Sequence, residues 1–346
     1  MPLGRRKQLI LQAIIEDYIK TAEPVGSRTV SKKYLTNVSP ATIRNEMADL
    51  EEMGYIEQPH TSAGRVPSDK GYRLYVDELM DKRTVNKQEH EFIRKEFMEV
   101  VGEIDMLIKH ASRILSAMTN YASIAMAPQF KRTSLKHLQL IKVDSYNILA
   151  VIVTDAGIIK NSIFRTETDI EDGVLEKINK ILNHKLVGLS IEELVNMDIS
   201  QLEVGAGPIG EYEQVFSKVL PELLQALRYS ERVEIFSDGA ANLLDLPEYN
   251  DVQKAKNFLN VLNESELLYD ILNDVSNNIS ITIGKENKIH QLKDCSLITA
   301  TYSYNGKIIG SIGVLGPTRM KYSKVISIVD CLTKNLSDIL TKIVKS

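Results

Sequence analysis

Apolar residues recur three or four positions apart through the first 53 residues, which is the spacing of one buried face of an α-helix. The spacing predicts a first helix over residues 5–20 and a short second helix over residues 27–34, with Ser27 as its cap. The second helix also carries cations that suit contact with the phosphates of a nucleic acid, namely Arg28, Lys32 and Lys33.

A third helix is predicted over residues 39–53, and it presents a narrow polar face. Ser39 is a favourable N-cap and also a candidate for phosphate contact, and Pro40 suits the first helical position. The apolar stripe of this helix is formed by Ile43, Met47 and Leu50. The other side carries Ala41, Thr42, Arg44 and Asn45. Arg and Asn have the forked donor geometry that fits base edges, and small neighbours allow close approach. These four residues are therefore candidates for base contact, and an ordinary surface helix is the alternative.

Two strand-like segments follow, at residues 55–58 and 65–67, and the turn-rich residues 59–64 separate them. Three helices and a β-hairpin in this order make a winged helix-turn-helix, in which the third helix enters a DNA groove. The wing would contribute further contacts to DNA, from His60, Thr61, Ser62 and Arg65.

Residues 69–80 continue as a helix, and residues 82–88 are polar and predict a linker. Beyond the linker, apolar residues alternate by four and three over residues 93–118, for nearly four heptads. Two interpretations stay open: a coiled coil that joins two copies, or a long helix packed on the domain that follows.

The rest of the chain predicts a multidomain α+β protein. Residues 138–143, 148–154 and 158–165 form a three-stranded meander, residues 170–231 are mostly helical, and helices follow at 251–262 and 264–273. Strands resume at 279–283, 295–304 and 307–315, where Asn305-Gly306 predicts a tight hairpin, and a last helix covers 322–344. The helical middle has the pattern of an insertion, and within it we expect a helix over residues 212–230.

The charge of the chain is distributed unevenly. Its net charge is −4, yet residues 1–45 carry eight Lys or Arg and three acids, or 8 − 3 = +5, so the remainder carries −4 − 5 = −9. A positive amino-terminal segment on an acidic remainder concentrates phosphate affinity at one end.

Enzyme motifs are missing from the sequence. No His occurs in an H-E-x-x-H context, and there is neither a G-x-S-x-G nor a Walker A motif, so we predict no catalytic residue, metal or cofactor. Gly310, Gly313 and Gly316 are spaced like a phosphate loop, but glycines in a strand more often allow close packing.

The sequence shows no signal for secretion or for insertion into a membrane. The two cysteines, Cys295 and Cys331, have no metal-site spacing, and the chain has no secretory pattern and no apolar run of about 20 residues. We therefore expect a cytoplasmic protein without a membrane partner.

Three stretches resemble a known family: residues 8–28 with Thr21-Ala22-Glu23-Pro24-Val25-Gly26-Ser27-Arg28, residues 39–47, and residues 58–68. With Ile312-Gly313-Val314-Leu315-Gly316-Pro317-Thr318-Arg319-Met320 near the other end, they are similar to HrcA, the bacterial heat-inducible transcription repressors. The resemblance spans essentially the whole chain and is most specific in the third helix and the wing.

The resemblance implies a homodimer that binds double-stranded DNA at an inverted-repeat operator of chaperone operons and is modulated by the GroEL chaperonin. It implies a winged helix-turn-helix over residues 1–81, a linker over 82–88, a GAF-like domain over 89–169 and 232–346, and an inserted dimerisation domain over 170–231.

Two other functions stay open. One is a regulator that senses a small molecule through the GAF-like domain, which a polar pocket enclosed by residues 279–283 and 295–315 would favour. The other is a structural or chaperone-client protein without affinity for DNA.

Overall fold

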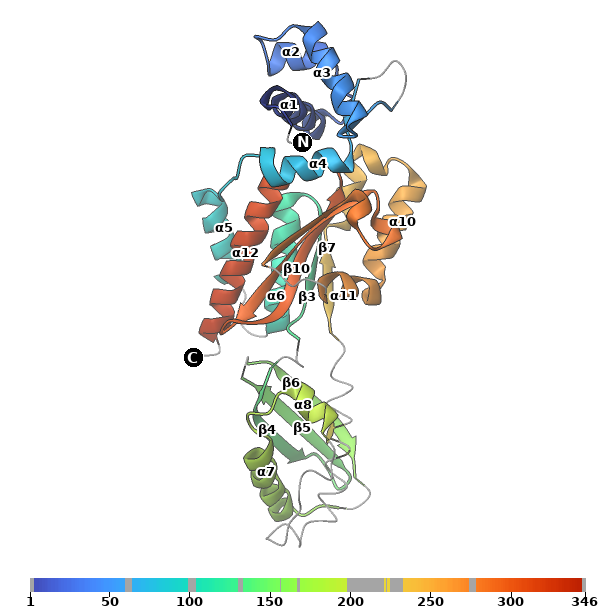
Figure 1. The fold of residues 1–346 in the computed structure, drawn as a ribbon. Helices are drawn as coiled ribbons and strands as arrows, with labels where there is room; N and C mark the ends of the chain where they lie inside the picture. Colours follow the sequence, from blue (N-terminus) through green and yellow to red (C-terminus); the bar gives the residue numbers. More distant parts are fainter. Residues whose placement is uncertain are drawn as a thin grey trace.

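The computed structural model describes residues 3–59, 64–98, 104–129, 133–155, 157–166, 169–197, 221, 223–224, 233–273 and 278–343. The chain is a mixed α+β protein with three parts that follow one another along its length (Figure 1). We call residues 3–80 the head, residues 87–129 with 233–343 the body, and residues 133–197 the insert.

The head begins with three helices, α1 (Arg5–Thr21), α2 (Ser27–Lys33) and α3 (Pro40–Glu52), as predicted. Strands β1 (Ile56–Glu57) and β2 (Val66–Pro67) then pair antiparallel, which confirms the hairpin. The predicted cap of α2 is wrong, because Gly26 occupies the N-cap position. Ser27 is instead the first helical residue and is buried.

Helix α4 (Asp69–Leu74) lies between the head helices and the body (Figure 1) and continues as a π-helical turn, Tyr75–Leu79. Ser68 caps α4 by accepting a hydrogen bond from the N–H of Gly71 at 3.1 Å. The chain has no helix or strand over residues 81–86, so the predicted linker is two residues too long at its far end. Helix α5 (Lys87–Met98) takes up those two residues.

The body is built on a five-stranded antiparallel sheet in the order β7-β3-β10-β9-β8. These strands are β3 (Ala122–Met126), β7 (Ile235–Asp238), β8 (Ile279–Ile283), β9 (Cys295–Tyr304) and β10 (Lys307–Pro317). Asn305 and Gly306 have φ values of 47° and 79°, the left-handed turn predicted between the last two strands. Strands β8, β9 and β10 agree with the segments predicted from the sequence, whereas β3 and β7 were not predicted.

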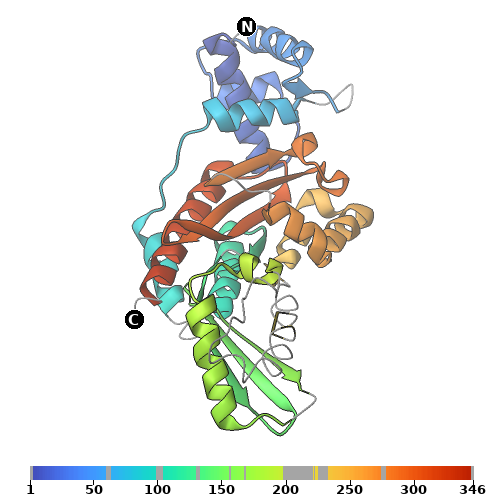
Figure 2. The same cartoon turned by 60° about the horizontal axis from the view of Figure 1, so that its bottom comes forward.

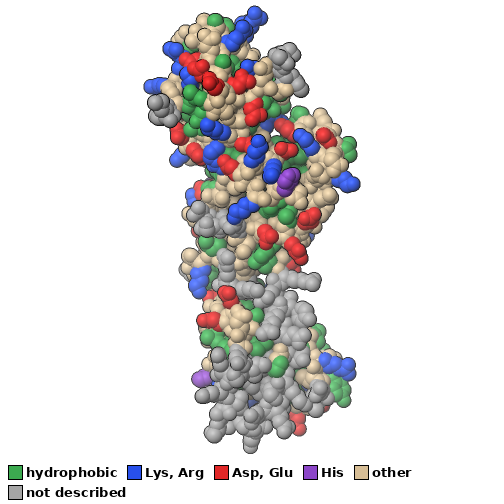
Figure 3. All heavy atoms as spheres, turned by 45° about the vertical axis from the view of Figure 1, so that its right-hand side comes forward, with side chains coloured by type: hydrophobic (Ala, Val, Ile, Leu, Met, Phe, Trp, Pro, Cys, Tyr) green, Lys and Arg blue, Asp and Glu red, His purple; other side chains and the backbone are tan. Residues whose placement is uncertain are grey.

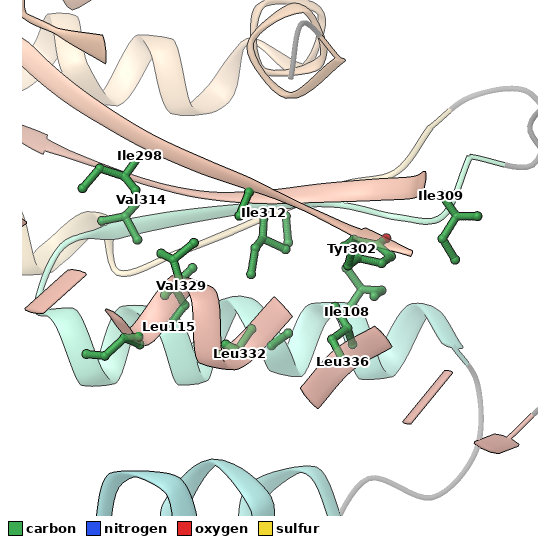
Figure 4. Close-up of a cluster of buried hydrophobic side chains, with 14 of the residues drawn as sticks. Ile108, Leu115, Ile298, Tyr302, Ile309, Ile312, Val314, Val329, Leu332 and Leu336 are labelled. Atoms are coloured by element: carbon green, nitrogen blue, oxygen red, sulfur yellow. The ribbon is translucent and has the colours of Figure 1, made fainter. Parts of the chain in front are cut away.

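Helices cover both faces of this sheet. On one face, α6 (Ile104–Thr119) and α12 (Tyr322–Ile343) bury Ile298, Ile312 and Val314 against Leu115 and Leu332 (Figure 4). On the other face, α10 (Val252–Asn263) and α11 (Ser265–Asn273) form a second apolar cluster, which includes Phe258, Val261, Leu268 and Leu272. Both helices agree with the segments predicted from the sequence.

The predicted single helix over residues 93–118 is wrong. The structure describes α5 and α6 as two helices, and Glu96 Oε2 of α5 lies 3.2 Å from His110 Nε2 of α6, although the residues are 14 positions apart. In one continuous helix that separation would span about 21 Å. The helices therefore lie side by side, and their apolar residues pack within the body, as the second interpretation of the heptads proposed.

The three glycines at residues 310, 313 and 316 have the packing role predicted for them. A Cβ at Gly310 would lie 2.2 Å from Tyr302 Oη, and one at Gly316 would lie 2.8 Å from Tyr121 Cδ1. At Gly313 it would lie 2.8 Å from Thr299 Cγ2. Neighbouring side chains therefore fill the space above each glycine.

The insert holds a separate three-stranded antiparallel sheet in the order β4-β5-β6. Its strands are β4 (Leu135–Lys142), β5 (Asn147–Thr154) and β6 (Ile159–Arg165), and α7 (Asp172–Leu186) packs on one face, with α8 (Ile191–Asn196) beside it (Figure 2). The strands are those predicted, but their placement in the GAF-like domain is wrong, since they share no sheet with the body. The boundary predicted at residue 170 falls inside this unit. Of the helix predicted over 212–230, the structure describes only residues 221 and 223–224, which are helical.

Candidate nucleic-acid interface

Helix α3 is fixed in the head by its cap and its apolar stripe. Ser39 Oγ accepts a hydrogen bond from the N–H of Thr42 at 3.1 Å, which satisfies one of the free donors at the helix start. Ile43 and Leu50 are fully buried, and Met47 is nearly so. With one face held in the head, the orientation of the opposite face is determined.

That opposite face carries the residues predicted to contact bases. Ala41, Arg44 and Asn45 are exposed, as is Ala48 one turn further on. Thr42 is half-buried, and its hydroxyl lies 2.9 Å from Ser39 Oγ. The Thr42 hydroxyl is therefore engaged by the cap, and its methyl group is the part that a groove could contact. The structure thus brings all four residues to one side of α3.

The structure separates the predicted phosphate-contacting cations into two groups. Lys33 Nζ lies 3.1 Å from Asp17 Oδ1, and the Tyr34 hydroxyl donates to the same oxygen at 3.1 Å. Burial and this hydrogen bond raise the pKa of Tyr34 to about 12. Arg65 lies 2.8 Å from Glu51 Oε2. Lys33 and Arg65 therefore have structural partners inside the head.

Three other cations remain without an internal partner. Arg28 and Lys32 of α2 and Arg44 of α3 are exposed. Across the ranges that the structure describes, none of the three forms an ion pair or hydrogen bond. Figure 3 shows Lys, Arg, Asp and Glu side chains over the head and over its junction with the body. An anionic ligand would meet the least internal competition at these three side chains.

Part of the positive charge of the first 45 residues is neutralised by acids of the same fold, so less of it is free to attract phosphates. Lys7 Nζ lies 2.7 Å from Glu46 Oε2 and 2.9 Å from Asp49 Oδ2, so it ties α1 to the back of α3. These hydrogen bonds raise the pKa of Lys7. Lys7 and Lys33 contribute to the net charge of +5 predicted to attract phosphates, but both pair with acids of the same fold.

The base of the wing is attached to the segment before α2. The N–H of Val25 donates to the Arg65 carbonyl at 2.8 Å, and the N–H of Arg65 donates to the Val25 carbonyl at 2.9 Å. His60, Thr61 and Ser62, which were predicted to contact DNA from the wing, lie outside the described residues.

Other classes of site have no support in the described parts of the chain. No group of three or more His, Cys, Asp or Glu there could hold a metal ion. In the same residues, no helix is both long and apolar enough to cross a membrane. The outward face of α3 and the cations beside it are thus the site to explain.

An amino-terminal head that exposes one helix face and neighbouring cations, joined to a separate α+β body, is the arrangement of a transcription regulator. A family model described as HrcA protein C terminal domain matches residues 105–326. The chain is also similar to the heat-inducible transcription repressors HrcA of Alkaliphilus metalliredigens, at 44% identity over 98% of both chains, and of Clostridium botulinum strain Alaska E43, at 45% over 98% of both. The chain belongs to the HrcA family of heat-inducible transcription repressors.

A solved structure shares the fold. It is titled a hypothetical protein at 2.2 Å resolution, and it aligns with a TM-score of 0.62 and 24% identity over 99% of both chains. At this identity the likeness concerns the fold alone.

Proposed function

We propose that this chain is a sequence-specific DNA-binding repressor of chaperone operons that binds an inverted repeat as a homodimer. The observation that carries the proposal is the outward face of α3, where Ala41, Arg44 and Asn45 are exposed. In this proposal the head is a winged helix-turn-helix, the body is GAF-like, and α3 enters the major groove. Arg44 and Asn45 contact base edges, and Ala41 and the Thr42 methyl group allow close approach. Arg28, Lys32 and Ser39 lie toward the phosphate backbone.

The open face of the insert sheet supports a homodimer. This face lies opposite α7, and its register aligns Ile141, Leu149 and Ile163 in one row across the three strands. Ile159 and Ile163 are 64% and 63% exposed. Apolar side chains gathered on one sheet face mark an interaction surface. A second copy fits because an inverted repeat has two-fold symmetry, which an isologous dimer matches.

A footprint on an inverted-repeat promoter tests the DNA-binding proposal. Arg44→Ala should relax specificity at one base pair of each half-site, because a forked base contact contributes about 1–3 kcal/mol of discrimination. Lys32→Ala should weaken binding to all sequences alike and reduce the salt dependence. Lys33→Ala is the matched control, since Lys33 is paired with Asp17. Unchanged operator preference in Arg44→Ala would refute the assignment of Arg44.

The same footprint, repeated with and without GroEL, tests the modulation by chaperonin that we include in this proposal. We expect more protection of the operator when the chaperonin is present, after mild heating of the repressor. Equal recovery of binding with and without GroEL would count against that part of the proposal and leave DNA binding standing.

A second candidate function, a response to a small molecule, is favoured by one cavity of the body. A cavity of about 520 Å³ lies between α11 and strands β8 and β9. Its sheet side carries the hydroxyl side chains Ser280, Thr282 and Thr299, and Leu297 and Ile271 provide apolar surface. A cavity with this mixed polar and apolar lining supports a ligand-sensing regulator as the alternative. A thermal-shift screen of metabolites, run beside the chaperonin assay, distinguishes the two modes of regulation.

A further inference from the structure

Arg319 of the body forms a hydrogen bond with the first helix of the head, and we call such an arginine contact between body and head a grip. It lies between β10 and α12, and its Nη1 donates to the carbonyl of Ile19, in the last turn of α1, at 2.8 Å. Its Nε and Nη2 donate to the two carboxylate oxygens of Glu248 at 2.6 and 3.1 Å. A cation at the C-terminus of a helix satisfies a free carbonyl and is favoured by the helix dipole. Glu248 holds the guanidinium in that orientation, and the Arg319 side chain is only 12% exposed.

Arg73 makes a second grip from a different helix of the head. From α4, its Nη2 donates to the carbonyl of Ile281 on edge strand β8 at 2.7 Å. Its Nε donates to Glu286 Oε1 at 2.9 Å, and Nη2 also contacts Glu286 Oε2. Burial alone would raise the pKa of Glu286, but the hydrogen bonds from Arg73 and from the N–H of Ile283 outweigh it and lower this pKa. The carboxylate therefore stays charged near neutral pH.

Close backbone contacts reinforce the second grip. The N–H of Lys285 donates to Asp69 Oδ2, at the start of α4, at 3.0 Å. Gly284 has a φ of +55°, and a Cβ there would lie 2.1 Å from Asp69 Oδ1. Tyr72 of α4 packs on Tyr322 of α12 with ring centroids 5.9 Å apart. Only a glycine lets the body approach α4 this closely.

Away from these grips, the head and body are not fully packed together. A cleft of about 730 Å³ is lined by Glu57, Ser68 and Lys70 of the head and by Lys254, Phe258 and Lys293 of the body. Residues 81–86 are the only covalent connection between head and body. In Figure 2 this segment runs outside the body, and it forms neither a helix nor a β-strand. A connection of this kind does not fix the orientation of two domains.

We propose that Arg319 and Arg73 are positioning residues that set the orientation of the head on the body, and through it the spacing between half-sites that the dimer accepts. Two grips on two different helices prevent the head from pivoting about either one. Because each base pair added between half-sites shifts and rotates the second half-site around the DNA axis, fixed heads accept a narrow range of spacers. This inference rests on the proposed function, since it requires a dimer on an inverted repeat.

The test uses the full chain and duplexes with identical half-sites, taken from the footprint, and spacers that differ by single base pairs. Arg319→Lys and Arg73→Lys keep the charge and lose the forked contacts. Arg113→Lys is the matched control, because Arg113 lies on α6, is 59% exposed and contacts only Asp238, at 3.9 Å, within the described residues. In the two junction variants, the affinity ratio between the best spacer and its neighbours should fall by about tenfold, or ~1.4 kcal/mol. The control should match the wild type.

A second measurement requires no DNA. Trypsin can cut after Lys82 or Arg83 in the connecting segment. Lys82 is already exposed, but the start of the segment is held by Ser323 Oγ of α12, which donates to the Asp81 carbonyl at 2.6 Å, and a released head should loosen this end. Cleavage there should be severalfold faster in the junction variants than in the wild type or Arg113→Lys. Unchanged spacer ratios and unchanged cleavage would overturn the inference and leave the proposed function intact. A wild type that binds no inverted repeat would overturn the proposed function, while faster cleavage in the variants would still support the grips.

Discussion

The two antiparallel sheets of this protein differ in how completely the chain covers them. The five-stranded sheet of the body has helices on both faces, and its Ile298 and Ile312 are fully buried (Figure 4). The three-stranded sheet of the insert has α7 on one face, whereas Ile159 and Ile163 on the other face are more than 60% exposed. The first sheet is covered on both faces by helices of its own chain, whereas the second presents a face whose isoleucines stay exposed.

The outer edge of the insert sheet, in contrast to its face, is closed. Asn179 of α7 donates to the carbonyl of Leu140 on β4 at 2.9 Å and accepts from its N–H at 2.7 Å. One turn later, Asn183 makes the same pair of hydrogen bonds with Leu138 at 2.6 and 2.9 Å. The two amides stand where a neighbouring strand would, so this edge is protected against pairing with another chain. The other edge of this sheet is formed by β6.

The largest expected effect comes from truncating the covered sheet. Ile312→Ala should lower the free energy of unfolding of the body by about 2–5 kcal/mol, because it removes buried methyl groups and leaves a cavity. Ile159→Ala, on the open face, should change it by less than about 0.5 kcal/mol. Urea denaturation followed by circular dichroism measures both. Equal losses would mean that the open face is covered within the chain.

The next effect concerns association rather than folding. Ile163→Asp should weaken the dimer by about 100-fold, or ~2.7 kcal/mol, because it places an unpaired charge in an apolar contact. Asn161→Asp, two residues away on the same face, is the control for added charge. Sedimentation velocity over a range of concentrations measures the monomer–dimer equilibrium. A dimer that tolerates Ile163→Asp would place the contact elsewhere.

The head could be derived from local signals, whereas the assembly of the body could not. The cap at Ser39, Pro40 and the stripe of Ile43, Met47 and Leu50 sufficed for α3, because each signal lies within a few residues of the others. Strand β3 was missed because its five residues are all buried, so it shows no alternation. The strands of the insert were predicted correctly as a meander but were assigned to the wrong domain, since periodicity does not say where a domain begins or ends.

In the candidate site, too, local patterns predict a helix face but not contacts between residues far apart in the sequence. The outward face of α3 follows from helical spacing, and the structure places all four predicted base-contacting residues on it. The pairing of Lys33 with Asp17 and of Arg65 with Glu51 joins residues 16 and 14 positions apart, so no local pattern reveals it. Likewise, the grip of Arg319 on α1 spans 300 positions. A motif that contains Arg319 was noticed, but its contact with the head was not predicted.

A smaller effect tests the closed edge of the insert sheet. Asn179→Ala should lower the stability of the insert by about 1–3 kcal/mol, because the N–H and carbonyl of Leu140 lose their partners in a buried place. Asn161→Ala removes an exposed amide from the same sheet and should have little effect. Hydrogen exchange of the amides of β4 reports the change directly. Exchange that stays as slow in Asn179→Ala would show that another group seals this edge.

The smallest expected effect compares two serines of the body sheet, one buried against α11 and one that lines the cavity beside it. Ser311 is buried on β10 and donates to the carbonyl of Leu272 on α11 at 2.6 Å, so Ser311→Ala should cost about 1 kcal/mol of stability. Ser280 of β8 lines the cavity beside α11, and its hydroxyl has no hydrogen-bond partner among the described residues. Ser280→Ala should therefore leave the thermal midpoint of the protein without added ligand unchanged. If a metabolite from the screen binds this cavity, Ser280→Ala should reduce the rise in midpoint that it produces, and Ser311→Ala should leave that rise intact.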